Sequence, residues 1–210
     1  MTLKDMPKRF RNIILTGMPG SGKSTFGKIY AIYSGRYFLD FDKYFEIVTK
    51  KKIAEFYQKE GEEAFRAQED LVLRKLDKKH NYVIAMGGGT VCTESNFEYA
   101  RRLGLIVFLD TPLEVLAKRI VNDNTTKLLR PMFSSLNSQE EILAKLKELW
   151  DARKEAYERG YIHLNTEFGS LDNLKLQLGL YEKKNAEREQ YKEKNPHKFQ
   201  RSFSSKNARN

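Results

Sequence analysis

The 210-residue chain contains a single cysteine, Cys92, so no disulfide can form within it. Stability must therefore come from an apolar core, and hydrophobic residues make up 40 % of the chain. This composition indicates a cytoplasmic protein, because structural disulfides are rare in that reducing compartment. No activating neighbour accompanies Cys92, so we expect a small core or loop residue and not a nucleophile.

Long apolar runs are missing as well. No segment approaches the roughly 20 consecutive apolar residues that would span a bilayer. The first residues, MTLKDMPKRFRN, lack the apolar stretch of a signal peptide, so we expect neither membrane insertion nor export. The three histidines, His80, His163 and His197, are scattered and indicate no metal centre.

Positive charge is abundant but unevenly distributed. The formal net charge is +10, and residues 183–210 alone carry nine Lys or Arg against three Glu. The remaining +4 is ordinary for residues 1–182, which we interpret as one domain followed by a basic, disordered tail. The tail also holds Tyr191, Phe199 and Phe203, so an RNA-binding function of the tail is one alternative, although an unfavoured one.

Apolar runs alternate with segments of helical period. Strands are predicted at residues 12–17, 36–40, 82–89, 105–110 and 161–165. Helices are predicted at 23–34, within 43–80, and at 94–103, 111–120, 138–159 and 170–181. This alternation predicts an α/β fold, a three-layer sandwich with a five-stranded parallel sheet. Residues 122–137 are polar and without a clear period, which is typical of a mobile loop.

The segment GMPGSGKST, residues 17–25, fits the phosphate-binding pattern G-x-x-x-x-G-K-[ST] between a predicted strand and a predicted helix. Glycines let backbone N–H groups turn toward an anion, and the helix N-terminus adds partial positive charge. Lys23 can bridge the β- and γ-phosphates, and the Ser24 hydroxyl can bind Mg²⁺. We expect Thr25 to cap or pack. The candidate nucleotide-binding residues are Gly17, Gly20, Ser21, Gly22, Lys23, Ser24 and Thr25.

A nucleoside triphosphate can serve a switch, a motor or a kinase. The guanine signature N-K-x-D is absent and the chain is short for a motor, so a small kinase is favoured. Its acceptor site is expected beyond the carboxyl ends of the strands. Asp40 and Asp42 end the second predicted strand there, where an extended chain projects both to one side, and Gly87–Gly89 end the third.

These features together resemble the shikimate kinase family, in the nucleoside-monophosphate-kinase-like branch of P-loop proteins. The resemblance covers residues 12 to about 181 and rests on six segments: GMPGSGKST, LDFD, EEAFRAQE (62–69), MGGGT (86–90), LLRPMF (128–133) and ARKEAYERGY (152–161). It implies ATP-dependent phosphorylation of the 3-hydroxyl of shikimate, with Mg²⁺, by a monomer. A related kinase of gluconate or of a nucleoside monophosphate stays open as an alternative.

The resemblance also implies roles for individual residues. Asp40 is associated with Mg²⁺, while Asp42 holds the acceptor hydroxyl and takes its proton; an N-cap is the plainer reading of Asp42. Arg66 and Arg153 bind the acceptor's carboxylate, although each could instead be a surface helix residue, Arg66 paired with Glu62, Glu69 or Asp70. The resemblance implies that Gly87, Gly88 and Gly89 let the acceptor approach the backbone and that Arg130 of the lid stabilises the charge on the transferring phosphoryl group. It also implies that Lys118 and Arg119 contact the nucleotide, although exposure on a helix is an alternative for both.

Three further residues are expected near the acceptor. Tyr57 and Phe65 match aromatic positions that wall the pocket in the family, and Glu69 is placed to orient Arg66. The stretch from Lys118 to Arg130 is a few residues longer than the family pattern predicts, which affects the expected length of the lid at 122–137.

Overall fold

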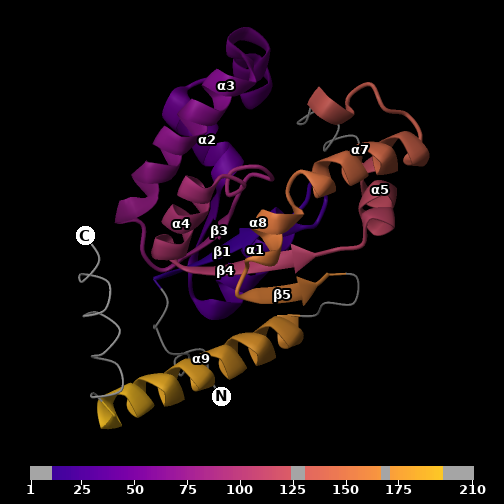
Figure 1. The fold of residues 1–210 in the computed structure, drawn as a ribbon. Helices are drawn as coiled ribbons and strands as arrows, with labels where there is room; N and C mark the ends of the chain where they lie inside the picture. The colour runs from indigo at the N-terminus through magenta and orange to yellow at the C-terminus, as the bar shows by residue number, and fades with distance from the viewer. Residues whose placement is uncertain (1–10, 124–130, 167–170, 196–210) are drawn as a thin grey trace, which may run out of the picture. The chain divides into compact units, whose positions relative to one another are not determined.

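The computed structural model describes residues 11–123, 131–166 and 171–195. The chain forms two compact units, Met1–Ser170 and Leu171–Asn210. In the first unit, β1 (Asn12–Thr16) is the fully buried centre of a five-stranded sheet (Figure 1). The other strands are β2 (Tyr37–Asp40), β3 (Tyr82–Ala85), β4 (Leu105–Asp110) and β5 (Ile162–Asn165).

The sheet is parallel throughout, in the order β2-β3-β1-β4-β5, which confirms the predicted fold class. Its register brings the carboxyl ends of the strands to one edge. Asp40 pairs with Ala85, Ala85 with Leu15, and Thr16 with Phe108. The segments that follow β1, β2 and β3 therefore begin side by side.

Helices cover the sheet on both faces (Figure 1). Ile14, Ile84 and Ile106 share one core cluster with the apolar residues of α2, α3 and α4, while Phe108 belongs to another with α5, α7 and α8. The helices are α1 (Lys23–Ser34), α2 (Phe41–Thr49), α3 (Ile53–Arg74), α4 (Glu94–Leu103), α5 (Leu113–Val121), α7 (Gln139–Asp151) and α8 (Lys154–Glu158). Two short 3₁₀ turns are η1 (Lys75–Lys78) and η2 (Pro131–Phe133).

Two helix predictions need correction. The expected helix at 138–159 starts with a capping box of Ser138 and Glu141, but it breaks after Asp151 and resumes at Lys154. The helix expected from Thr111 begins at Leu113, with Pro112 as its N-cap. The Thr111 hydroxyl instead hydrogen-bonds that of Thr166, beyond β5.

The helix α3 is bent at Gly61, whose φ of 81° and ψ of 175° are not helical. Glycine is the residue that adopts such a conformation without a steric penalty from Cβ. The segment before the bend packs Phe56 against Phe45 of α2, and the segment after it packs Phe65 against the same ring. Together α2 and α3 form the predicted acceptor-side helices within 43–80.

The second unit contains α9, Leu171–Lys194. A helix was predicted at 170–181 and disorder from 183, so the helix is longer than expected. Lys, Glu, Gln and Arg dominate the added turns, and these residues have good helix propensity even without an apolar stripe. Residues 196–210 lie outside the described part of the chain.

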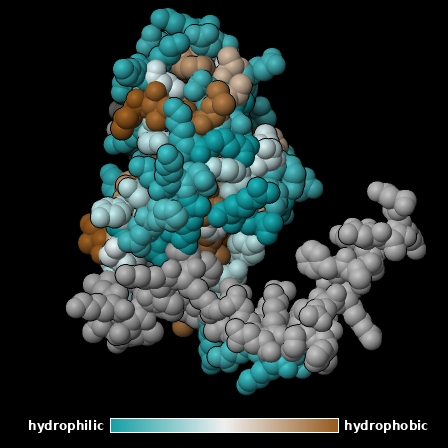
Figure 2. Space-filling view, turned by 90° about the vertical axis from the view of Figure 1, so that its left-hand side faces the viewer, coloured by the Kyte–Doolittle hydropathy of each residue, from teal (hydrophilic) through white to brown (hydrophobic). Residues whose placement is uncertain are grey.

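The surface of the described residues is mainly polar. Figure 2 shows a largely hydrophilic face on which apolar side chains appear as a few separate spots. None of the described helices combines the length and the apolar character that crossing a membrane requires.

Candidate active site

The phosphate loop lies between β1 and α1, as predicted. Gly20 and Gly22 have φ values of 80° and 87°, which L side chains rarely adopt, and Gly22 is the N-cap of α1. Lys23 is buried, and its Nζ donates to the carbonyls of Gly17 and Met18 at 2.9 Å each. The ammonium group therefore lies at the mouth of the loop, beside the positive end of the α1 dipole.

Ser21 and Thr25 differ in position from the rest of the loop residues. Ser21 is buried, and its N–H donates to Met18 O at 3.2 Å, so it helps to close the loop. Thr25 is exposed on the first turn of α1. The N-cap of α1 is Gly22, with no hydrogen bond from a capping side chain, so Thr25 neither caps this helix nor packs in the core.

Ser24 and Asp40 form a close oxygen pair at the loop. Ser24 Oγ donates to Asp40 Oδ2 at 2.6 Å, and Asp40 Oδ1 accepts from Lys43 N at 3.3 Å as the N-cap of α2. A hydroxyl beside a carboxylate is a donor set that suits Mg²⁺, which completes its shell with phosphate oxygens and water. Among the described residues, no group of three or more His, Cys, Asp or Glu could hold a metal ion.

Asp42 is not an extended residue, which corrects the expectation that Asp40 and Asp42 share one side of a strand. The strand ends at Asp40, and Asp42 lies in the first turn of α2. The N-cap role considered for Asp42 belongs to Asp40. The Asp42 Oδ1 atom lies 2.7 Å from the point that a Cβ on Gly87 would occupy, so its carboxylate is next to the triple glycine.

The triple glycine is where the acceptor-side residues meet. A Cβ on Gly89 would lie 2.8 Å from Arg66 Nη1, and one on Gly88 would lie 3.4 Å from Arg153 Nη1. With Gly87 against Asp42, the three glycines contact three predicted substrate-binding side chains. Only the absence of Cβ atoms at Gly87 and Gly89 allows this close approach.

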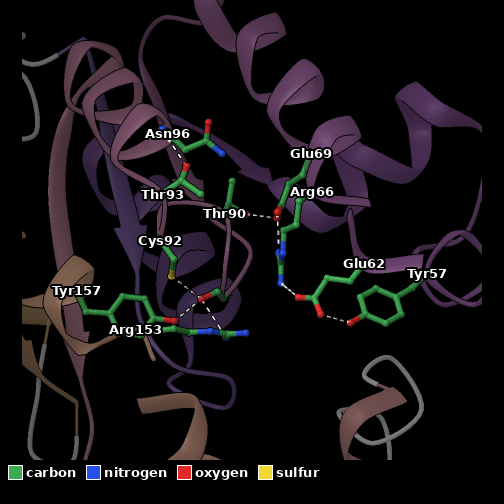
Figure 3. Close-up of polar contacts among 11 residues, drawn as sticks. Tyr57, Glu62, Arg66, Glu69, Thr90, Cys92, Thr93, Asn96, Arg153 and Tyr157 are labelled. Carbon is green, nitrogen blue, oxygen red and sulfur yellow. Dashed lines mark hydrogen bonds and ion pairs between the residues drawn. The ribbon is translucent and has the colours of Figure 1, made fainter. Parts of the chain in front are cut away.

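Arg66 is held by carboxylates on the same helix (Figure 3). Its Nη1 donates to Glu69 Oε2 at 2.7 Å and its Nη2 to Glu62 Oε1 at 3.4 Å, while Asp70 pairs with Arg74 instead. Burial raises the pKa of Glu69 against the opposing effect of Arg66. Burial disfavours the Arg66 charge too, but Glu69 and Glu62 raise the pKa of the guanidinium, so Arg66 is cationic.

Arg153 lies at the break between α7 and α8, not on a solvated helix face. Its Nη1 donates to the carbonyl of Gly88 at 3.2 Å, and the Tyr157 hydroxyl donates to the same oxygen (Figure 3). Cys92 Sγ is 3.9 Å from that oxygen, and burial raises the pKa of its thiol, so the thiol form is favoured.

Two residues that hydrogen-bond within the site, Thr90 and Tyr157, were not assigned roles from the sequence. Thr90 donates to Glu69 Oε1 at 2.5 Å, and Tyr157 donates to the glycine loop. Both residues lie inside the motifs MGGGT and ARKEAYERGY, but a hydroxyl in a motif does not reveal its partner. The orienting contact of Glu69 with Arg66, in contrast, was expected and is present.

Two further predicted residues, Lys118 and Arg119, lie in the last turn of α5. Arg119, on α5, donates to Gly20 O at 3.4 Å and to Thr166 O at 3.2 Å, so it joins the phosphate loop to the segment after β5. Lys118 is exposed on the same helix. Arg130 and the other residues of the lid segment 124–130 lie outside the described residues, so the role of Arg130 stays a prediction.

The fold and this site define a P-loop phosphotransferase in which a carboxylate and two arginines lie against a glycine loop. A family model described as "Shikimate kinase" matches residues 19–173, most of the chain. The chain therefore belongs to the shikimate kinase family. Enzymes of this family use ATP as their phosphoryl donor.

Individual relatives agree with the family match. The shikimate kinase of Chlorobium chlorochromatii is 36 % identical over 162 residues, covering 77 % of this chain and 85 % of the relative. That of Persephonella marina is 35 % identical over 157 residues, covering 75 % and 90 %. A structure of shikimate kinase from Acinetobacter baumannii in complex with shikimate is 31 % identical, with a TM-score of 0.72 and coverage of 85 % and 96 %.

Proposed function

We propose that this chain transfers the γ-phosphoryl group of ATP to the 3-hydroxyl of shikimate, producing shikimate 3-phosphate and ADP. The observation that carries the proposal is the convergence of Asp42, Arg66 and Arg153 on Gly87–Gly89. A cyclic hydroxy acid needs two kinds of recognition, cations for its carboxylate and an acceptor for its hydroxyl protons. Both kinds are present here beside a phosphate loop.

The nucleotide is bound by the loop and α1. Backbone N–H groups and Lys23 hold the phosphates, and Lys23 exchanges its contacts with Gly17 O and Met18 O for phosphate oxygens. Ser24 and Asp40 would hold Mg²⁺, which supplies positive charge to the β- and γ-phosphates when bound. Arg119 contacts the nucleotide from α5 because it already reaches Gly20 of the loop.

The acceptor is bound on the opposite side of the loop. Arg66 and Arg153 bind its carboxylate, since a planar guanidinium matches two carboxylate oxygens. Gly87–Gly89 allow the ring to approach the backbone. Asp42 accepts a hydrogen bond from the 3-hydroxyl, directs its oxygen at the γ-phosphorus and takes its proton as the new bond forms. Arg130 is predicted to offset the charge on the transferring group from the lid.

We further propose that residues 1–182 form the catalytic domain and that the enzyme is a cytoplasmic monomer. Apart from Arg130, the contacts used above come from described residues of one chain, which supports a monomer. The lone cysteine supports a reducing compartment. Nucleic acid is not needed for this activity.

A panel of acceptors tests the proposal. ADP release would be measured by an enzyme-coupled assay with shikimate, gluconate and nucleoside monophosphates in turn. We expect shikimate to give by far the highest kcat/KM, because gluconate is an open chain that cannot place both its carboxylate and the reacting hydroxyl as rigidly. Equal or faster turnover of gluconate would contradict the assignment.

A further inference from the structure

A continuous chain of hydrogen bonds runs through the acceptor side of the site (Figure 3). The Tyr57 hydroxyl donates to Glu62 Oε2 at 2.8 Å, and Glu62 Oε1 accepts from Arg66 Nη2 at 3.4 Å. Arg66 Nη1 donates to Glu69 at 2.7 Å, and Thr90 donates to the other oxygen of Glu69 at 2.5 Å. Arg66 therefore lies between two carboxylates.

The two carboxylates differ in how firmly they are held. The Glu69 side chain is 4 % exposed, and both of its oxygens accept short hydrogen bonds, so Glu69 is a fixed partner of Arg66. The Glu62 side chain is 62 % exposed, and its contact with Arg66 is longer by more than half an ångström. An incoming carboxylate can therefore replace Glu62, but not Glu69, as a partner of Arg66.

Glu62 also experiences the charges that the acceptor's carboxylate would meet. Its pKa is lowered first by the hydrogen bond from Tyr57 and then by the charges of Arg66 and Arg153. These are the same two arginines to which the acceptor's carboxylate is assigned. Glu62 is thus a carboxylate of the protein itself that interacts with the two arginines proposed to bind the substrate's carboxylate.

The bend at Gly61 is what brings Tyr57 to Glu62. Residues five apart on a continuous helix point about 140° away from each other, so they do not meet. The non-helical backbone of Gly61 lies between the two residues and removes that restriction. The Tyr57 ring is held in turn by an edge contact with Phe65, with 5.8 Å between the ring centroids.

We propose that Glu62 occupies the acceptor-carboxylate position on Arg66 in the substrate-free enzyme, and that Tyr57 sets how readily Glu62 releases it. The proposal rests on the proposed function, in which Arg66 binds the acceptor's carboxylate. When the acceptor enters, its carboxylate replaces Glu62 at Nη2. Glu62 retains the hydrogen bond from Tyr57, which keeps its charge satisfied and lowers the cost of the exchange. Tyr57 is a positioning residue that acts through Glu62.

The KM for shikimate tests this exchange, because the two residues have opposite effects. Glu62→Gln removes the competing charge, so KM should fall about two- to fivefold, the range expected of an exposed ion pair. Tyr57→Phe removes the hydrogen bond from Tyr57 to Glu62, so that Arg66 is the partner left to Glu62 in this chain of contacts. Glu62 is then harder to displace from Arg66, and KM should rise by a similar factor. The double variant should behave like Glu62→Gln alone, because without the Glu62 charge the hydroxyl has nothing to position.

Two controls separate the exchange from a general structural effect. Glu55→Gln neutralises an exposed carboxylate on the same helix, paired with Lys59, and should leave KM unchanged. With shikimate methyl ester as acceptor, the effect of Glu62→Gln should disappear, because no substrate carboxylate competes for Arg66. Thermal melting of each variant would establish that all of them are folded.

The outcomes distinguish this proposal from the function on which it rests. If Arg66→Lys raises KM for shikimate but Glu62→Gln does not lower it, the exchange is wrong and the acceptor site stands. An equal effect of Glu62→Gln on the ester, or a Tyr57→Phe effect that persists in the double variant, also overturns the exchange. If Arg66→Lys leaves KM unchanged, the carboxylate site and the exchange both fall.

Discussion

Asp40 and Asp42 are two residues apart, but their neighbours give them different tasks. Asp40 Oδ2 accepts from Ser24 Oγ of the phosphate loop, and Asp40 Oδ1 caps the N-terminus of α2. Asp42, two residues further along the chain in the first turn of α2, lies next to Gly87. In the proposed function, Asp42 therefore takes a proton from the acceptor without disturbing Asp40, the proposed metal ligand.

Replacement of Asp42 by asparagine tests whether its carboxylate has a role separate from that of Asp40. We expect Asp42→Asn to lower kcat by about 10²- to 10⁴-fold, the usual contribution of a positioned proton acceptor. Binding of ADP, measured by calorimetry, should stay close to that of the unmodified enzyme because Asp42 is not a loop residue. An Asp42→Asn enzyme with full activity would show that the acceptor hydroxyl is oriented by another group.

Glu69 makes stability depend on pH, and the sign follows from its burial. Burial raises its pKa above the ordinary value of 4.5, so the folded protein binds this proton more tightly than the unfolded chain. The stabilisation is complete below the ordinary pKa and is lost as pH rises through the raised value. Relative to Glu69→Gln, the unmodified protein should therefore lose free energy of unfolding above about pH 4.5.

Denaturant unfolding at a series of pH values measures that difference. The lost contacts with Arg66 and Thr90 give Glu69→Gln a constant offset, so only the change of the difference with pH is informative. A difference that stays constant, or that moves in favour of the unmodified protein as pH rises, would mean that Arg66 outweighs burial at this carboxylate.

At the level of elements, the site depends on where helices begin and break. The early start of α2 turns Asp42 toward the glycine loop, and the break between α7 and α8 places Arg153 at the N-cap of α8. A single helix over 138–159 would have left Arg153 on a regular helical face. The positions of two residues with proposed binding roles, Asp42 and Arg153, therefore follow from helix ends.

The bend at Gly61 is the element-scale feature most open to test. A Cβ there would meet no atom within 4 Å, so Gly61→Ala probes the backbone conformation and not packing. We expect the substitution to lower the free energy of unfolding by about 1–3 kcal/mol, the cost of this conformation for an L residue. Chemical denaturation would measure it, with the exposed Gln58→Ala on the same helix as a control expected within about 0.5 kcal/mol of the unmodified protein.

If Gly61→Ala is as stable as the unmodified protein, α3 tolerates a continuous helix and the bend is not required. The same variant would then separate Tyr57 from Glu62, and the hydrogen bond between them would be lost without a cost to the fold.

At the level of the whole molecule, the described residues of the candidate site and the excess positive charge lie in different parts of the chain. Every described site residue lies within Met1–Ser170, and the family match ends at residue 173. More than half of the net charge lies in residues 183–210, of which α9 includes the first part. The charge is therefore no indication of how the site works.

Removal of residues 183–210 tests this separation. We expect the truncated chain to keep its kcat and its KM for shikimate within about twofold, because no contact of the site involves that segment in the described structure. Steady-state kinetics of the truncated and full-length chains in parallel would measure it. A large fall in kcat/KM would assign the basic segment a part in catalysis, whereas lost RNA binding with intact kinetics would assign it a separate function.

Features that depend on neighbours in sequence could be predicted from the sequence. The five strands, the phosphate loop with Lys23 and Ser24, and the capping box at Ser138 all follow from short patterns of apolar, glycine and polar residues. The contact between Glu69 and Arg66 was also predictable, because residues three apart meet on one helix. Local chemistry thus determined the fold class and the nucleotide side of the site.

Only the tertiary structure decided what the acceptor-side residues contact. Thr90 hydrogen-bonds Glu69, 21 positions away in the chain, and Tyr157 hydrogen-bonds Gly88, 69 positions away. Asp42 lies next to Gly87, 45 positions away. Such pairs arise from the packing of α3, α8 and the β3–α4 loop around a parallel sheet. No local pattern specifies them, because the free energy that brings them together comes from core burial elsewhere in the molecule.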